Sequence, residues 1–241
     1  MIKTITSREN ALIKNAFYLK TNKGRKEKGQ FLCEGKKSLE LALKSHLVTD
    51  VFTLEKLENI PETVNQYLVT PEIIDKIAFS AHPEGVVFIS NFLPMTKPAI
   101  IERAVYLDNI ADPGNMGTII RTALALEYDA IILAKECVSI YNEKVISASK
   151  GAIFLLPVYE DDLNSYKGSH KIIASTLSHD SRALDEVQIH EPFILVLGNE
   201  AHGISQKVNE LADIKVTIPM KDIDSLNVSV AAGILMYHFK K

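Results

Sequence analysis

Short apolar runs alternate with amphipathic segments from residue 104 toward the end of the chain, and this pattern predicts an α/β fold. Each apolar run is short enough for one strand, and helical periodicity fills the segments between the runs. Such alternation is typical of a mostly parallel sheet covered by helices on both faces. We expect strands at 104–110, 130–134, 153–159, 171–176 and 193–199, and helices at 115–127 and 142–152.

The first 92 residues predict shorter and less regular elements. We expect helices over 7–21 and 36–45, a charged, glycine-punctuated loop over 22–29, and strands at 30–35, 48–54 and 84–92. The next stretch, LPMTKPA (93–99), holds two prolines and little periodicity, which is typical of a boundary between domains. We therefore predict two domains, 1–95 and 96–241.

Composition narrows the class of protein. The 241-residue chain is 46% hydrophobic and 24% charged, which is ordinary for a soluble globular protein with a sizeable core. No apolar run approaches the roughly 20 residues that span a bilayer, and the start, MIKTITSREN, lacks the apolar core of a signal peptide. Cys33 and Cys137 match no metal-binding spacing, so we expect free, reduced thiols. These features predict a cytoplasmic protein with no membrane partner and no metal.

Charge is distributed unevenly along the chain. Residues 1–45 carry eleven Lys or Arg against four Glu, although the whole chain has a net charge of −3. A basic end on an acidic protein indicates a polyanionic partner that touches mainly this end. The alternative is a solvated, lysine-rich surface helix. Aromatic residues are sparse in this region, which favours phosphate contacts over a platform for stacked bases.

Candidate chemistry first appears in DPGNMGTIIRTA (112–123), which follows an apolar strand. Asn115 stands near the start of the expected helix, and Arg121 is the one basic residue of that helix. Gly114 and Gly117 leave the loop bare, so a ligand or another segment could approach the backbone closely. A guanidinium without a nearby counter-charge suits a phosphate or a carboxylate. A capped turn followed by a surface arginine would have the same pattern.

Two further loops carry polar groups. In FILVLGNEAHGIS (193–205), Glu200 lies at the carboxyl end of a strand, where ligands bind in open α/β sheets. Glu200 could accept hydrogen bonds from a ligand or hold an arginine, or it could be a plain loop carboxylate. His202 has no partner at metal-ligand spacing, and we interpret it as a loop histidine.

The third loop leads into the last helix, in IPMKDIDSLNVSVAAGI (218–234). Ser225 and Asn227 fall at the first turn of this helix, and Ser225 is the candidate N-cap. Gly233 costs about 1 kcal/mol relative to alanine in a helix interior. We therefore expect a packing reason for it, either within the fold or across a dimer interface.

Together the three segments strongly resemble the three motifs of the SpoU (TrmH-like) RNA ribose 2'-O-methyltransferases. SASKGAIFLLPV (147–158) matches a further segment of that family, and TSRENALIKNAFYLK, GQFLCEGKKSLELAL and HPEGVVFI look like its small N-terminal RNA-binding domain. One departure lies at the end of TALALE (122–127), where the family often has Phe-Gly and this chain has Leu126-Glu127. That position ends a helix, so we expect the change to affect the helix end and not the site.

The resemblance implies a fold and a reaction. It implies a trefoil-knotted α/β methyltransferase domain with a mostly parallel sheet, preceded by a small α/β, ribosomal-protein-like RNA-binding domain. The implied reaction is S-adenosyl-L-methionine-dependent 2'-O-methylation of a ribose in structured RNA, with ribosomal RNA favoured over transfer RNA. The implied assembly is a homodimer with the site near its interface. The alternatives are a catalytically silent RNA-binding or ribosome-assembly factor, a tRNA 2'-O-methyltransferase, and a methyltransferase acting on another acceptor.

The resemblance also assigns roles to residues. Arg121 would act on the 2'-hydroxyl and the adjacent phosphate, either by orienting the nucleophile or as an unusual base. Asn115 and Asn227 would hold the ribose or the arginine, Glu200 would fix Arg121 or Asn115, and Ser225 would contact substrate or cap the helix. The expected S-adenosylmethionine contacts are Thr176, Leu177, Leu197, Gly198, Ile218, Met220 and Leu226.

Overall fold

A seven-stranded sheet dominates the C-terminal part of the chain, and all of its strand pairings are parallel. The computed structural model describes residues 2–240. In spatial order the strands are β10 (Arg182–Ala183), β12 (Ile214–Thr217), β9 (Lys171–Ser175), β11 (Phe193–Leu197), β6 (Arg103–Leu107), β7 (Ala130–Leu133) and β8 (Val158–Glu160). Parallel pairing agrees with the apolar, uninterrupted character of the central strands β11 and β7, whose residues are all buried.

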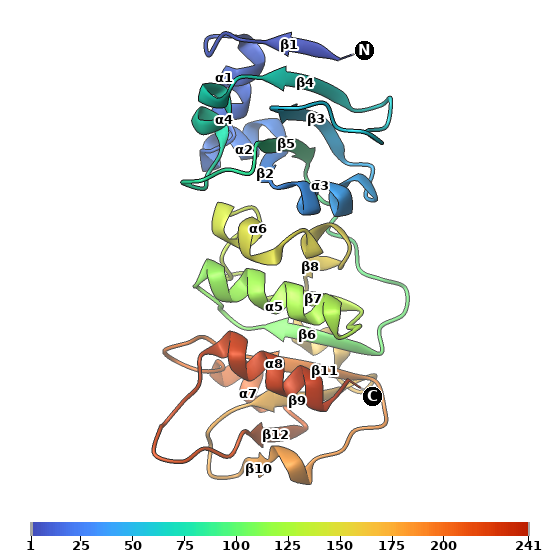
Figure 1. Cartoon of the computed structure of the whole chain (residues 1–241). Helices are drawn as coiled ribbons and strands as arrows, with labels where there is room; N and C mark the ends of the chain where they lie inside the picture. The colour runs from blue at the N-terminus through green and yellow to red at the C-terminus, as the bar shows by residue number, and fades with distance from the viewer. Residues whose placement is uncertain (1, 241) are drawn as a thin grey trace. The chain divides into compact units, whose positions relative to one another are not determined.

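Helices cover both faces of this sheet. Figure 1 shows α5 (Pro113–Ala125) and α8 (Val228–His238) side by side over one face, where α5 contacts β7 and α8 contacts β11. Side chains alternate between faces along a strand, so Tyr106 and Ile132 point to the other face. There they pack with Val208 of α7 (Gln206–Leu211) and with the 3₁₀ helix η2 (Leu163–Tyr166). Another 3₁₀ helix, η3, spans Leu184–Glu186.

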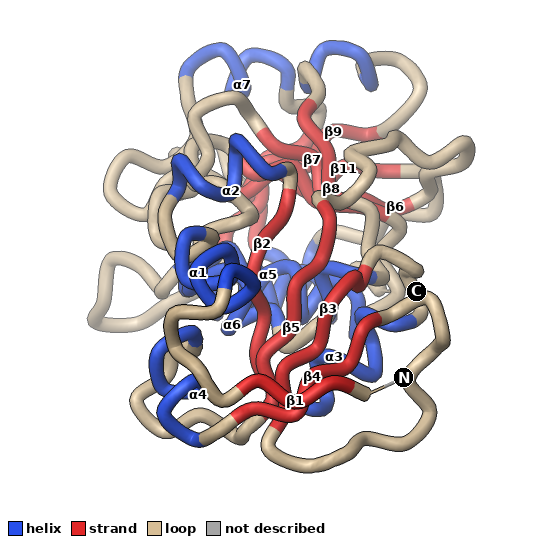
Figure 2. Tube along the Cα trace, turned by 90° about the horizontal axis from the view of Figure 1, so that it is seen from above, coloured by secondary structure: helices blue, strands red, loops and turns tan. Residues whose placement is uncertain are grey.

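The N-terminal part of the chain has its own sheet, whose neighbouring strands are seen in Figure 2. The order is β1 (Lys3–Ile5), β4 (Asn65–Val69), β3 (Val48–Thr53), β5 (Val86–Asn91) and β2 (Gln30–Glu34). β1 and β3 pair in parallel with β4, whereas β5 is antiparallel to both β3 and β2. The helices here are α1 (Ala11–Tyr18), α2 (Asn22–Lys28), α3 (Lys36–Leu43) and α4 (Pro71–Ile77).

The contacts divide the chain into two compact units. The first holds the residues up to Pro94 together with Tyr141–Leu155, and the second holds Met95–Ile140 together with the residues from Leu156 onward. Tyr141–Leu155 contains α6 (Glu143–Ser149) and the 3₁₀ helix η1 (Ala152–Phe154). Phe154 of this segment stacks on the buried Phe31, at 5.8 Å between ring centroids. The domain limits expected from the sequence, 1–95 and 96–241, stay a prediction.

Two local expectations were wrong. The expected loop over 22–29 is instead α2 (Asn22–Lys28) with its C-cap, Gly29. Thr21 caps the first turn by accepting from the Gly24 N–H, and Gly29 ends the helix at φ 62°. The expected strand over 153–159 starts only at Val158. Lys150 and Gly151 both have positive φ, which turns the chain into η1 before the strand can begin.

Three smaller findings concern features that the composition addressed. Both cysteines are free thiols, Cys33 buried and Cys137 half-buried, and burial raises the pKa of each. Within residues 2–240 no helix is both long and apolar enough to cross a membrane. In the same residues no three His, Cys, Asp or Glu side chains are grouped so that they could hold a metal ion.

Candidate active site

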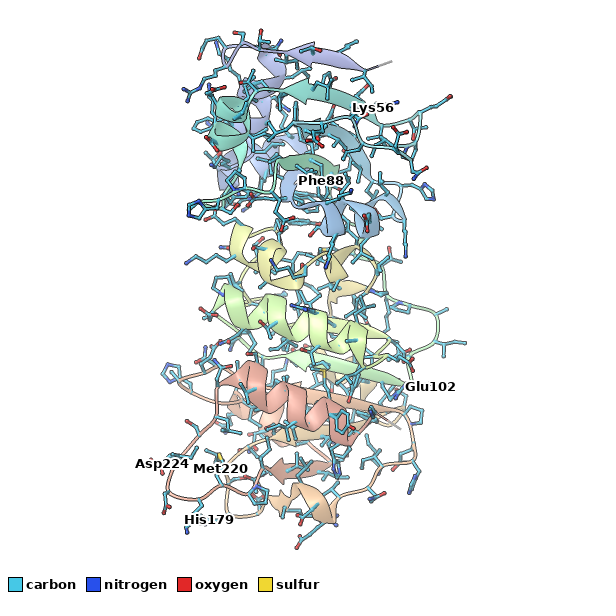
Figure 3. All side chains as sticks on the ribbon, viewed as in Figure 1. Lys56, Phe88, Glu102, His179, Met220 and Asp224 are labelled. Atoms are coloured by element: carbon cyan, nitrogen blue, oxygen red, sulfur yellow. The ribbon has the colours of Figure 1, made fainter. Side chains whose placement is uncertain are left out.

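A cavity of about 800 Å³ lies where β9, β11 and β12 end at their carboxyl edge. Its walls are the three loops that follow these strands, together with the first turns of α7 and α8. Figure 3 labels Met220 and Asp224, which lie on the loop between β12 and α8 and both line the cavity. Every residue expected to contact the methyl donor lies in its wall: Thr176, Leu177, Leu197, Gly198, Ile218, Met220 and Leu226.

The loop after β11 is held closed by hydrogen bonds of its own. The backbones of Asn199 and Gly203 exchange two hydrogen bonds, each with an N···O distance of 2.9 Å. The Asn199 side chain accepts from the N–H groups of Ala201 and His202 and donates to the carbonyl of Asn109. A Cβ on Gly198 would lie 2.2 Å from the carbonyl carbon of Gly203, so only glycine fits there. His202 is an exposed loop residue in the cavity wall.

A chain of side-chain hydrogen bonds joins this loop to the N-termini of α5 and α8. Asn115 Nδ2 donates to Glu200 Oε1 at 2.9 Å, and Asn227 Nδ2 donates to Asn115 Oδ1 at 3.0 Å. A carboxylate only accepts hydrogen bonds, so the Glu200 contact determines which way the Asn115 amide faces. Asp112 completes the arrangement by capping α5 through the Asn115 N–H, at 2.8 Å. These hydrogen bonds therefore connect the three motifs, with Asn115 of the first motif bonded to Glu200 of the second and to Asn227 of the third.

Asn227, and not Ser225, is the N-cap of α8. Its Oδ1 accepts from the Ser229 N–H at 2.9 Å and from the Val230 N–H at 3.3 Å, so it satisfies two otherwise free donors of the first turn. The expected cap at Ser225 was wrong, because the helix begins at Val228. Ser225 is an exposed loop residue in the cavity wall.

Arg121 is the expected site residue that lies outside this arrangement. It is exposed on α5 and does not line the cavity. Arg121 lies six positions after Asn115, and at 3.6 residues per turn this places the two side chains roughly 120° apart around the helix. Asn115 is buried and faces α8, so Arg121 faces away from the hydrogen-bond chain of its own molecule.

Two supporting residues were missed by sequence reasoning. Asn199 holds its loop together, and a Gly-Asn pair directly after an apolar strand is a turn signal that could have indicated it. Asp108, only 3% exposed, accepts from the Ser205 N–H at 2.6 Å and ties the end of β6 to the start of α7. The sequence signal that could have indicated Asp108 is a single carboxylate directly after an apolar run.

Comparison with known proteins agrees with this geometry. Residues 102–237, more than half of the chain, match the SpoU rRNA Methylase family. The chain belongs to the SpoU rRNA methylase family. Residues 10–87 also match the MRM3-like substrate binding domain. The family and the α/β fold class expected from the sequence are thereby confirmed, while the trefoil knot stays a prediction.

Similar proteins extend over the whole chain. An uncharacterised tRNA/rRNA methyltransferase of Synechocystis is 32% identical, covering 100% of this chain and 94% of that protein. The 23S rRNA (guanosine(2553)-2'-O)-methyltransferase RlmP of Bacillus subtilis is 29% identical, covering 99% of this chain and 100% of that protein. The AdoMet-bound rRNA methyltransferase of Sinorhizobium meliloti superposes with a TM-score of 0.87 at 27% identity, covering 98% of this chain and 97% of that one.

Proposed function

We propose that this chain methylates a ribose 2'-hydroxyl of structured ribosomal RNA, with S-adenosyl-L-methionine as the methyl donor. The observation that carries the proposal is the hydrogen-bond chain from Glu200 through Asn115 to Asn227, which joins the three family motifs beside one cavity. The rRNA 2'-O-methyltransferase of B. subtilis, similar over its full length, supports the choice of substrate.

The cavity has the composition that this donor requires. Its volume falls within the range of about 300–1,000 Å³ that is usual for small-molecule sites. Leu197, Ile218, Met220 and Leu226 offer apolar surface for an adenine ring, and the loop backbones offer hydrogen bonds to its edges. The donor supplies a methyl group on a sulfonium, which is electrophilic enough to need no metal.

The residues of the chain would then position the acceptor. A ribose hydroxyl is a poor nucleophile at neutral pH, so its proton must be stabilised or removed as it attacks. A guanidinium offers hydrogen-bond donors in a planar fork and no acceptor, so we assign Arg121 to orienting the hydroxyl and the neighbouring phosphate. Asn115 and Asn227 are already paired with protein groups, so we assign them to holding the motif loops in register. Alignment of this kind supplies much of the rate of a bimolecular transfer.

We further propose that two copies assemble through α8. Val230, Ile234 and Tyr237 are 52%, 40% and 62% exposed and recur at helical spacing on one face of this helix. Gly233 lies on the same stripe, and a Cβ there would meet nothing within 4 Å. The fold described for residues 2–240 thus supplies no packing reason for a helix glycine that costs about 1 kcal/mol, whereas close approach of a second helix would supply one.

A dimer of this kind would also give Arg121 a place in the site. α5 packs directly beside α8, so a second copy seated on α8 lies near the exposed face of α5. We propose that Arg121 of one copy holds the acceptor whose methyl donor lies in the cavity of the other. RNA would reach the site through the basic N-terminal part of the chain, and a cytoplasmic location follows from a ribosomal substrate.

The deciding experiment maps 2'-O-methylation across cellular ribosomal and transfer RNA with and without the gene. Loss of one ribose methylation, restored by the wild-type chain and not by Arg121→Ala, supports the proposal and names the nucleotide. If the lost mark lies in tRNA, the substrate assignment is wrong while the reaction stands. If no mark is lost and calorimetry detects no uptake of S-adenosylmethionine, the chain is an RNA-binding factor without methyl transfer.

A further inference from the structure

An exposed aromatic ring lies among lysines on the surface of the N-terminal unit. Phe17, in α1, is 48% exposed, although burial of a phenyl ring is worth about 2 kcal/mol. Lys20 Nζ lies 5.8 Å and Lys76 Nζ 5.7 Å from the centroid of this ring. Lys20 Nζ is also 5.2 Å from the ring of Phe79, which is partly buried against the core.

Both ammonium groups are held in place by the backbone. Lys20 Nζ donates to the carbonyl of Ala78 at 2.5 Å, and Lys76 Nζ donates to the carbonyl of Arg8 at 2.8 Å. A lysine side chain free in solvent would lose about 1.5–2 kcal/mol of rotamer entropy on binding a ligand. In this protein the hydrogen bonds already restrict both lysine side chains, so little further rotamer entropy is lost when a ligand binds.

The charges around the ring determine which partner fits. Glu9 pairs with Lys14 at 2.9 Å and with Lys76 at 3.5 Å, so it offsets part of the positive charge on one side. No ion pair to Lys20 is found among the described residues, and its segment, residues 1–45, carries eleven Lys or Arg against four Glu. The two ammonium groups favour an anionic group beside the ring, and the exposed ring favours an aromatic or heterocyclic group stacked on it. The partner that fits carries both groups.

We propose that Phe17, Lys20 and Lys76 form a binding site for one unpaired nucleotide of the RNA substrate. The base stacks on the exposed face of Phe17, and the flanking phosphates contact the two ammonium groups. The inference rests on the proposed function, because it takes RNA as the partner, and adds to it a mode of binding. It also changes the sequence-based expectation for this region, which favoured phosphate contacts without base stacking.

The test uses the full chain and two labelled probes, a 16-nucleotide oligoadenylate RNA and a 16-base-pair RNA duplex. Fluorescence anisotropy is recorded over a salt series for wild type, Phe17→Ala, Phe17→Tyr and Lys20→Met. Phe17→Ala should weaken oligoadenylate binding by about 5- to 150-fold with an unchanged salt slope, while duplex binding stays close to wild type. Phe17→Tyr should restore binding. Lys20→Met should lower the salt slope by about 0.7, the value for one phosphate contact on a single strand.

Leu12→Ala is the matched control, because Leu12 is a 37% exposed apolar residue of the same helix and has no aromatic ring on which a base could stack. It should bind both probes as wild type does. Wild-type affinity of Phe17→Ala for oligoadenylate, or equal losses on both probes, overturns the inference. Uptake of S-adenosylmethionine by the same preparations is measured in parallel. If Phe17→Ala binds RNA as wild type does while the chain takes up S-adenosylmethionine and transfers methyl groups, only this binding site is rejected. If the wild-type chain shows neither uptake nor methyl transfer, the proposed function is rejected.

Discussion

The side-chain amide of Asn115 donates to the carboxylate of Glu200 across 85 positions of the chain, with an N···O distance of 2.9 Å. Glu200 Oε1 also lies 3.4 Å from the N–H of Asp112, so this one carboxylate serves the first turn of α5 twice. The contact joins the loop that walls the cavity to the helix that carries Arg121. A single carboxylate therefore fixes this loop relative to the first turn of α5.

Glu200→Ala should lower kcat by about 10- to 100-fold, because it frees the Asn115 amide and lets α5 shift relative to the cavity; a displacement of about 1 Å is enough for the larger loss. Glu200→Gln keeps an oxygen that can accept from Asn115 and should recover much of the rate. Steady-state transfer of a labelled methyl group measures both variants. Equal losses in Glu200→Ala and Glu200→Gln would mean that the charge itself takes part in the reaction.

Arg121→Ala should abolish methyl transfer and leave the dissociation constant for S-adenosylmethionine within about 3-fold of wild type, less than one lost hydrogen bond costs. Donor binding should be retained because Arg121 is exposed and lies outside the cavity wall. Mixed dimers of Arg121→Ala and Gly198→Ala chains test whether it acts across the interface, because Gly198→Ala removes donor binding through the loop after β11 and leaves Arg121 in place. If Arg121 acts across the interface, one site of each mixed dimer has an intact cavity and an intact Arg121, and the mixture recovers activity. A mixture as inactive as its parents would place Arg121 in the site of its own copy.

The order of strands and loops could be predicted from the sequence, because apolar runs and glycine-bearing turns are local signals. The residues that line the cavity could be predicted from the family resemblance. Their convergence has a physical reason, because loops that follow parallel strands meet at one edge of a sheet. The direction of the Asn115 amide could not be predicted. It depends on Glu200 and Asn227, which lie 85 and 112 positions away.

Local errors had local causes. The segment now seen as α2 was interpreted as a loop because it is rich in lysine and contains Gly24. That glycine is required by a neighbour, since a Cβ there would lie 2.2 Å from the carbonyl oxygen of Tyr18. The departure at Glu127 was interpreted correctly as a matter of the helix end. Glu127 has φ 60°, a left-handed conformation that glycine adopts without strain, and it directly follows the C-cap Leu126.

Gly233→Ala should stabilise the isolated fold by about 0.5–1 kcal/mol, because alanine is the better helix residue and its Cβ meets nothing in the chain. The same change should weaken the dimer, since it adds a methyl group where a second helix approaches. Sedimentation equilibrium and urea unfolding measure the two effects. Tyr237→Ala, at an exposed position on the same stripe, should weaken the dimer without the gain in stability. Unchanged self-association in both variants would exclude α8 as the interface.

Gly198→Ala should destabilise the chain by about 1–3 kcal/mol and abolish donor binding, because the added Cβ would overlap the backbone of Gly203. Gly203→Ala is the control from the same loop. Its Cβ meets no atom within 4 Å, so only the left-handed backbone at φ 68° is strained, at a cost of about 1–2 kcal/mol. Calorimetric titration with S-adenosylmethionine should therefore show weaker uptake by Gly203→Ala and none by Gly198→Ala. Equal binding by both would contradict the role of this close approach.

The carboxylate of Asp161 should give the second unit a stability that disappears in acid. Burial alone would raise its pKa, but hydrogen bonds from Lys97 Nζ at 3.1 Å and from the buried Tyr166 hydroxyl at 2.9 Å lower the pKa overall. A folded-state pKa below the unfolded value means that the ionised group stabilises the fold above about pH 4. That contribution is lost as the pH falls through the folded-state pKa.

Asp161→Asn should therefore lower the free energy of unfolding by about 1.5–3 kcal/mol at pH 7, the usual range for hydrogen bonds to a charged group. The difference from wild type should shrink steadily as the pH falls below about 4, because the wild-type carboxyl is then protonated too. Urea unfolding at several pH values measures it. Asp185→Asn, at an exposed position, should stay within about 0.5 kcal/mol of wild type throughout. A difference between Asp161→Asn and wild type that is the same at pH 3 and pH 7 would show that the charge of Asp161 contributes nothing.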